Sequence, residues 1–104
     1  MNESEFLNIT DALFDQIEEA LDTAGADVDV NRNGNVLELE FDSGAKLIVN
    51  RHIPNSEVWL AARSGGYHYR LAANGDWEDT RGGTHLLAML AQLVESTDGT
   101  KVAF

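Results

Sequence analysis

The residues of this sequence best suited to chemistry are carboxylates spaced three and four residues apart: Asp11, Asp15, Glu18 and Asp22. At about 100° per residue they fall within a sector of roughly 60° on one side of a helix, and Glu19 lies beside them. Asp27 and Asp29 follow in an alternating run, so they share one face of a strand. Carboxylates without sulfur or imidazole suit hard cations, and exposed ones bind them weakly.

A solvated helix face is the ordinary interpretation of such an acidic stripe. Solvated faces usually carry lysine or arginine three or four residues from each acid, but this helix has no base. We therefore expect like charges to lower stability without local compensation. Two functional interpretations remain open, which are weak metal binding and the steering of a basic protein partner. Metal is expected where helix and strand carboxylates converge without an intervening base, at Glu18, Glu19, Asp22, Asp27 and Asp29. A partner would also meet Asp11 and Asp15.

A tryptophan in the middle of a predicted strand is the second candidate. In the run EVWLAA the alternate residues Val58 and Leu60 are apolar and belong in a core, which leaves Trp59 on the other face. In the run YHYRL the same alternation leaves His68 and Arg70 outside. An exposed tryptophan beside histidine and arginine has the composition of a protein interface.

The elements that must position these residues follow from the spacing of apolar side chains. From Asn2 to Ala24 the spacing is helical, with Glu5 placed to complete a capping box and Gly25 to end the helix. The period then changes to two. Short strands, mostly separated by glycine turns, are predicted at residues 27–30, 36–41, 46–50, 57–62 and 67–71, with a last one around Trp77.

A second helix is predicted from an N-cap at Thr84 to a stop before Asp98. We expect Val102 and Phe104 of the tail to pack against the helices. Strands in series flanked by two helices indicate an α+β fold of two layers. The prediction is one domain, residues 1–104, with both helices on one face of a five- to six-stranded antiparallel sheet.

Net charge is −11 and is unevenly distributed. Residues 1–42 contain twelve acids and one base, whereas residues 43–104 contain six of each. Such a field repels phosphate backbones, so nucleic-acid binding is not expected. No apolar run approaches the roughly 18 residues of a membrane span, and the N-terminus lacks a secretory pattern. We therefore expect a cytoplasmic protein that does not bind membranes.

Several catalytic arrangements are missing from the sequence. It has no cysteine, which excludes disulfides, thiolate metal sites and a cysteine nucleophile. His52, His68 and His85 show no ligand spacing and are interpreted as ordinary surface or hydrogen-bonded residues. A hydrolase with paired carboxylates would need a cleft that raises the pKa of one of them. An exposed stripe provides no such asymmetry.

The motifs taken together resemble the frataxin family, in particular bacterial frataxins of the CyaY type. The resemblance spans nearly the whole chain: an acidic first helix leads into DVDV, GNVLELEF, KLIVNRHIPNSEVWLAARSGGYHY, GDW and TRGGTHLLAML, in that order. The segment from Asn50 to Tyr69 is the specific part. It matches the family pattern N-(K/R)-Q-x-P-x-x-Q-(I/V)-W-L-A followed by G-G-x-H-(F/Y), except that His52 and Glu57 stand where the family usually has glutamine.

The resemblance implies an αβ sandwich that binds Fe(II) and Fe(III) weakly on an acidic ridge and regulates, or supplies iron to, iron–sulfur cluster assembly. The implied partners are the cysteine desulfurase and the cluster scaffold protein. The ridge residues carried over are Glu18, Glu19, Asp22, Asp27 and Asp29, while Asn50 and Trp59 match the sheet-face interaction surface. We expect a non-enzymatic monomer, with iron-dependent oligomerisation left open. The alternative is an acidic interaction module in which metal has no physiological role.

Overall fold

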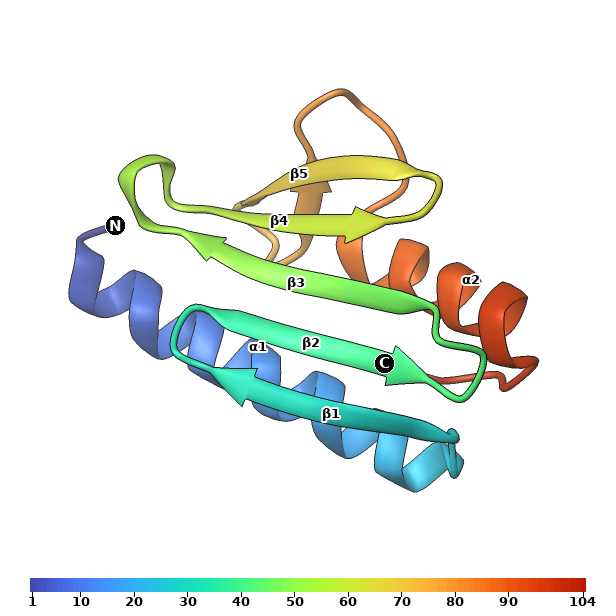
Figure 1. Cartoon of the computed structure of the whole chain (residues 1–104). Coiled ribbons are helices and arrows are strands. Elements are labelled where there is room, and N and C mark those ends of the chain that lie inside the picture. The colour runs from blue at the N-terminus through green and yellow to red at the C-terminus, as the bar shows by residue number, and fades with distance from the viewer.

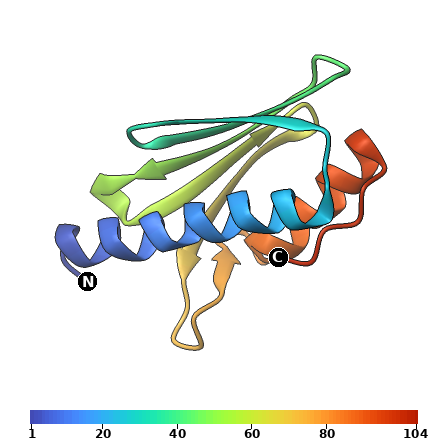
Figure 2. The same cartoon turned by 90° about the horizontal axis from the view of Figure 1, so that it is seen from below.

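The computed structural model describes residues 1–104 and has two layers (Figures 1 and 2). Helices α1 (Glu3–Ala24) and α2 (Leu86–Asp98) cover one face of a six-stranded antiparallel sheet. Its strands follow one another in chain order: β1 (Val28–Asn33), β2 (Val36–Phe41), β3 (Lys46–His52), β4 (Glu57–Ala62), β5 (Gly65–Leu71) and β6 (Trp77–Asp79). The predicted α+β sandwich is confirmed, and β1 and β6 form its edges.

Some element boundaries differ from the predictions. β1 begins at Val28 and runs to Asn33, so Asp27 precedes the strand. β3 continues through Arg51 and His52, two residues beyond the apolar run, because both still pair with β4. The strand expected around Trp77 begins at that residue. A short 3-10 turn, η1 (Ile53–Asn55), contains the only proline and joins β3 to β4.

The helix ends follow local chemistry at three of four positions. The Asn2 side chain accepts a hydrogen bond from the backbone N–H of Glu5 at 2.8 Å, which is the forward half of the predicted capping box. Gly25 ends α1 with φ of 68°, a left-handed conformation that glycine adopts without strain. Gly99 ends α2 in the same way. The N-cap predicted at Thr84 is wrong, because His85 holds the extended cap conformation and its side chain makes no capping bond.

The core lies between the helices and the sheet. The apolar stripe of α1 is buried, and it packs against alternate residues of the strands and against Leu86, Leu90 and Val94 of α2. Trp77 meets the ring of Phe6 edge-on, with centroids 6.3 Å apart. Val102 and Phe104 of the tail pack on this core as expected. Neither helix is both long and apolar enough to cross a bilayer.

Candidate functional site

The acidic face of α1 is held by an arginine from the neighbouring edge strand. Side chains alternate along β1, and Arg32 points to the helix side. One of its guanidinium nitrogens, Nη1, lies 2.5 Å from Asp15 Oδ1 and 3.4 Å from Glu18 Oε2, while Nη2 lies 3.4 Å from Asp11 Oδ1. The hydrogen bond to Asp15, together with the charges of all three carboxylates, raises the pKa of Arg32. A single base therefore bridges three acids of the helix.

A second arginine reaches the same helix from β3. Arg51 Nη1 lies 2.5 Å from Asp11 Oδ1, and its other nitrogen donates to the carbonyl oxygen of Gly34 at 2.9 Å. Its side chain is only 9 % exposed. Both Arg51 and Arg32 lie over the ring of Phe14, each with its guanidinium carbon 5.3 Å from the centroid. The N-terminal half of the acidic stripe is thus an ion-pair network built over an aromatic ring.

Two expectations about the ridge are therefore corrected. The stripe does have compensating bases, which come from β1 and β3 rather than from the helix itself. Glu18, expected among carboxylates with no intervening base, contacts Arg32. A sequence reading that considers only helix neighbours at i+3 and i+4 misses bases that reach the helix from another layer.

The remaining ridge carboxylates, Glu19, Asp22, Asp27 and Asp29, make no ion pair. Asp29 lies directly across from Glu40 in the register of β1 and β2, on the face of the sheet away from the helices. The carboxylates of α1 and β1 therefore lie on opposite sides of the edge strand. The ridge passes around that edge instead of forming one flat surface.

Two acids that were not candidates in the sequence analysis, Asp42 and Asp98, lie near Asp27. Its carboxyl group, fully exposed, has its pKa raised chiefly by a hydrogen bond to Asp42 and the charge of that carboxylate, then by Asp98 and Asp29. Its backbone N–H also donates to Asp98 Oδ2 at 3.4 Å. These acids come from the β2–β3 turn and the end of α2. The end of the ridge is thus more acidic than the sequence spacing indicates.

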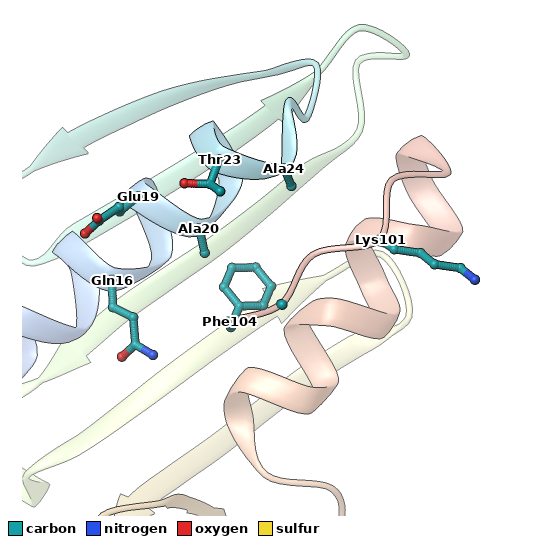
Figure 3. Close-up of a pocket in the computed structure, with 8 residues that line it drawn as sticks. Gln16, Glu19, Ala20, Thr23, Ala24, Lys101 and Phe104 are labelled. Carbon is teal, nitrogen blue, oxygen red and sulfur yellow. The ribbon is translucent and has the colours of Figure 1, made fainter.

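No three histidine, aspartate or glutamate side chains converge closely enough to hold an ion between them. A hollow of about 360 Å³ between α1 and the C-terminal tail has Glu19 as its only acid. In Figure 3 the Phe104 ring lies beside Ala20, and Lys101 points away from Glu19. No lysine forms an ion pair with Glu19 or with the other carboxylates of the ridge.

The predicted partner-binding residues of the sheet lie in one row. Asn50 of β3 pairs with Trp59 of β4, and Trp59 pairs with His68 of β5, all on the face away from the helices. Val58 and Leu60 are buried on the other face, which confirms the predicted strand phase and the outward direction of Trp59. Trp59 is half-buried and His68 is exposed.

The half-burial of Trp59 comes from its neighbours on the sheet. The His52 ring stacks on one face of the indole at 4.0 Å and the His68 ring on the other at 4.2 Å, with interplanar angles of 9° and 8°. The indole Nε1 donates to Glu57 Oε1 at 2.8 Å. The two departures from the family pattern, His52 and Glu57, are therefore both in contact with Trp59. The same alternation that placed Trp59 outside also places them there.

A shallow hollow of about 400 Å³ adjoins this row. Its lining is mainly apolar and includes Val36, Ile48 and Ala61 beside Asn50 and Trp59. The molecule thus presents two separate surfaces, an acidic one at the β1 edge and an aromatic one at the centre of the sheet. An apolar centre with a polar margin is typical of protein interfaces.

The molecule is an α+β sandwich with an acidic first helix and a half-buried tryptophan on the open face of its sheet. The model of the Frataxin-like domain matches residues 1–100. The iron–sulfur cluster assembly protein CyaY of Paraburkholderia phymatum is 46 % identical over 102 residues, which cover 98 % of this chain and 96 % of that protein.

Two solved structures agree. The frataxin of Psychromonas ingrahamii superposes with a TM-score of 0.92 at 42 % identity, covering 98 % of this chain and 96 % of the other. A trimeric frataxin from the yeast Saccharomyces cerevisiae, complexed with ferrous iron, has a TM-score of 0.70 at 31 % identity, covering 95 % and 88 %. This chain belongs to the frataxin family.

Proposed function

We propose that this protein is an iron-binding regulator and iron donor in iron–sulfur cluster assembly. The observation that carries the proposal is the group of unpaired carboxylates around the end of α1 and the start of β1, in a chain that is 46 % identical to an iron–sulfur cluster assembly protein. Exposed oxygen ligands without a closed cage favour hard cations and release them readily. Weak binding suits a protein that hands iron on rather than one that stores it.

The two surfaces suggest two partners. The acidic ridge is complementary to a basic groove, and we assign it to docking of the cysteine desulfurase, with Asp11 and Asp15 extending the charged area. The row of Asn50, Trp59 and His68 is apolar at its centre, and we assign it to the cluster scaffold protein. The protein acts by binding and has no catalytic group of its own in this proposal.

Metal titration followed by NMR tests the iron-binding part. Mn(II) or Fe(II) should broaden the signals of Glu19, Asp22, Asp27 and Asp29 first, because Glu18 contacts Arg32, and changing these four residues to their amides should remove most of that broadening. The matched control changes four exposed acids away from the ridge, Glu3, Glu5, Asp76 and Glu95, to their amides. Equal loss of broadening in the control would show that only net charge matters, and the proposed metal site would be abandoned.

A second candidate is an acidic interaction module without a physiological metal role. It is favoured by the absence of any convergent set of three ligands. Desulfurase and cluster-assembly rates, measured with and without the protein across iron concentrations, separate the two functions. An effect that depends on iron supports the donor role, and one that is the same at every iron concentration supports the interaction module.

A further inference from the structure

We infer that Arg32 competes with cations for the carboxylates of Asp15, Glu18 and Asp11. Metal is thereby excluded from this part of α1 and confined to the end of α1 and the start of β1. The inference rests on the proposed metal-binding function and adds the residue that sets where metal binds. Without Arg32, the carboxylates of Asp15 and Glu18 would be free to bind a cation, as those of Asp22, Asp27 and Asp29 are.

The competition follows from the atoms that Arg32 occupies. Its two terminal nitrogens contact Asp15 Oδ1, Glu18 Oε2 and Asp11 Oδ1. Nη2 also donates to the Asp11 backbone carbonyl at 3.3 Å. These oxygens belong to successive turns of one helix face, the arrangement in which carboxylates can approach one ion together. A divalent cation that binds there must displace the guanidinium from the same oxygens.

The neighbours of Arg32 also fix the position of its guanidinium over α1. Arg32 pairs with Leu37, one pair before the β1–β2 turn, so the strand register fixes it over α1. Its guanidinium lies over Phe14, and its side chain is only 30 % exposed. A tethered group acts at a high effective concentration, in the millimolar range or above. A weakly bound free cation is therefore at a disadvantage wherever Arg32 reaches.

Beyond the reach of Arg32 no base interferes. Asp22 lies one turn further along α1, Asp27 and Asp29 follow it, and none of them makes an ion pair. Asp27 lies beside Asp98, whose Oδ2 accepts from the Asp27 backbone N–H at 3.4 Å, and no base pairs with either carboxylate, so a cation that binds there breaks no ion pair. The two halves of the ridge therefore differ in their affinity for cations although their ligand types are the same.

The test replaces Arg32 and maps Mn(II) broadening along the chain by NMR. In the wild type, broadening should begin at Glu19, Asp22, Asp27 and Asp29 and reach Asp11 and Asp15 only at much higher Mn(II). In Arg32→Gln it should appear at Asp15 and Glu18 at Mn(II) concentrations about three- to tenfold lower than in the wild type, as expected for removal of exposed ion pairs. Asp11 should change less, because Arg51 still contacts it.

Arg63→Gln is the matched control. Arg63 is exposed in the β4–β5 turn and makes no ion pair, so this variant changes net charge equally but leaves the ridge intact. It should keep the wild-type pattern. An equal gain at Asp15 and Glu18 in both variants would show a general charge effect and overturn the inference.

The remaining outcomes separate the inference from the proposed function. If the wild type shows no broadening at the end of the ridge, the proposed metal function fails. If the wild type does show broadening there, and Arg32→Gln adds none at Asp15 and Glu18, only the role of Arg32 fails. Arg32→Lys covers the case in which the glutamine variant does not fold. Its ammonium keeps the charge but lacks the two-pronged guanidinium, and it should give an intermediate shift; a wild-type pattern in this variant would overturn the inference.

Discussion

The rings of Trp59 and His68 lie parallel on adjacent strands, with centroids 4.2 Å apart. His52 covers the other face of the indole in the same way, and Glu57 takes its N–H. A partner therefore cannot stack on Trp59 without moving a histidine, and it meets the exposed edges of three rings together. The surface proposed for the scaffold protein is therefore the stack rather than the tryptophan alone.

Trp59→Ala should weaken binding to the scaffold protein by about 2 kcal/mol, chiefly through faster dissociation, because an aromatic contact is lost. The free energy of unfolding should fall by only about 1–2 kcal/mol, since the indole is half-buried and its loss removes two stacking contacts. Trp77→Ala, at a tryptophan that is 5 % exposed, should cost about 3–5 kcal/mol and serves as the comparison. Binding kinetics and chemical denaturation measure both effects. A core-sized loss of stability for Trp59→Ala, or unchanged scaffold binding, would contradict the assignment.

Binding to the desulfurase should depend on salt. Neutralising Glu18, Glu19 and Asp22 to their amides should slow association roughly tenfold at low ionic strength, the lower end of electrostatic steering. The wild-type rate should fall towards the variant rate as the screening length shortens to about 8 Å near physiological ionic strength. Stopped-flow measurements over a salt series check this. A rate that does not change with salt would mean that the ridge is not the docking surface.

The raised pKa of Asp27 predicts that the free energy of unfolding depends on pH. Its pKa is raised by Asp42 and its other acidic neighbours, so the folded state holds a proton more tightly than the unfolded state. This contribution is present at low pH and is lost as pH rises from the ordinary aspartate value of about 3.8 through the higher folded value. Asp27→Asn should therefore raise the melting temperature at pH 7 and leave it nearly unchanged at pH 3. Thermal denaturation at the two pH values is the measurement, and a lower melting temperature at pH 7 would contradict it.

Arg51 should matter more for stability than any base on the surface. Arg51→Met should lower the free energy of unfolding by roughly 1–3 kcal/mol, because it removes a guanidinium that is only 9 % exposed, with its ion pair to the half-exposed Asp11 and its bond to the Gly34 carbonyl. Arg63→Met, at an exposed and unpaired position, should change it by no more than about 0.5 kcal/mol. Urea denaturation of both variants decides the point. Similar small losses would mean that the network over Phe14 contributes little.

The features that could be predicted from sequence are those set by local periodicity. Alternation alone placed Val58 inside and Trp59 outside, because neighbouring residues of a strand must point to opposite faces. The same alternation puts His52 and Glu57 beside Trp59 once the β3–β4 register is known. Their stacking and hydrogen bond depend on that register, which the sequence motifs do not state.

The arginine contacts could not be predicted for a different reason. Arg32 and Asp15 are 17 residues apart, and Arg51 and Asp11 are 40 apart, so their contact depends on how α1 lies across the sheet. The helix spacing correctly identified the acidic face but gave no sign of which carboxylates would be paired. The acidic group around Asp27 also joins the β2–β3 turn to the end of α2. Contacts between residues so far apart in the sequence depend on how the helices pack against the sheet.

The order of the strands has a consequence for how the chain reaches its native state. Every strand pairs with the one that follows it, so the sheet can grow by successive hairpins with short loops to close. Local pairing of this kind gives low contact order and fast folding for a protein rich in strands. During synthesis, α1 leaves the ribosome before the strands, and its apolar stripe has no partner until those hairpins form. The surplus of negative charge on α1 then opposes association of its exposed apolar stripe with other chains.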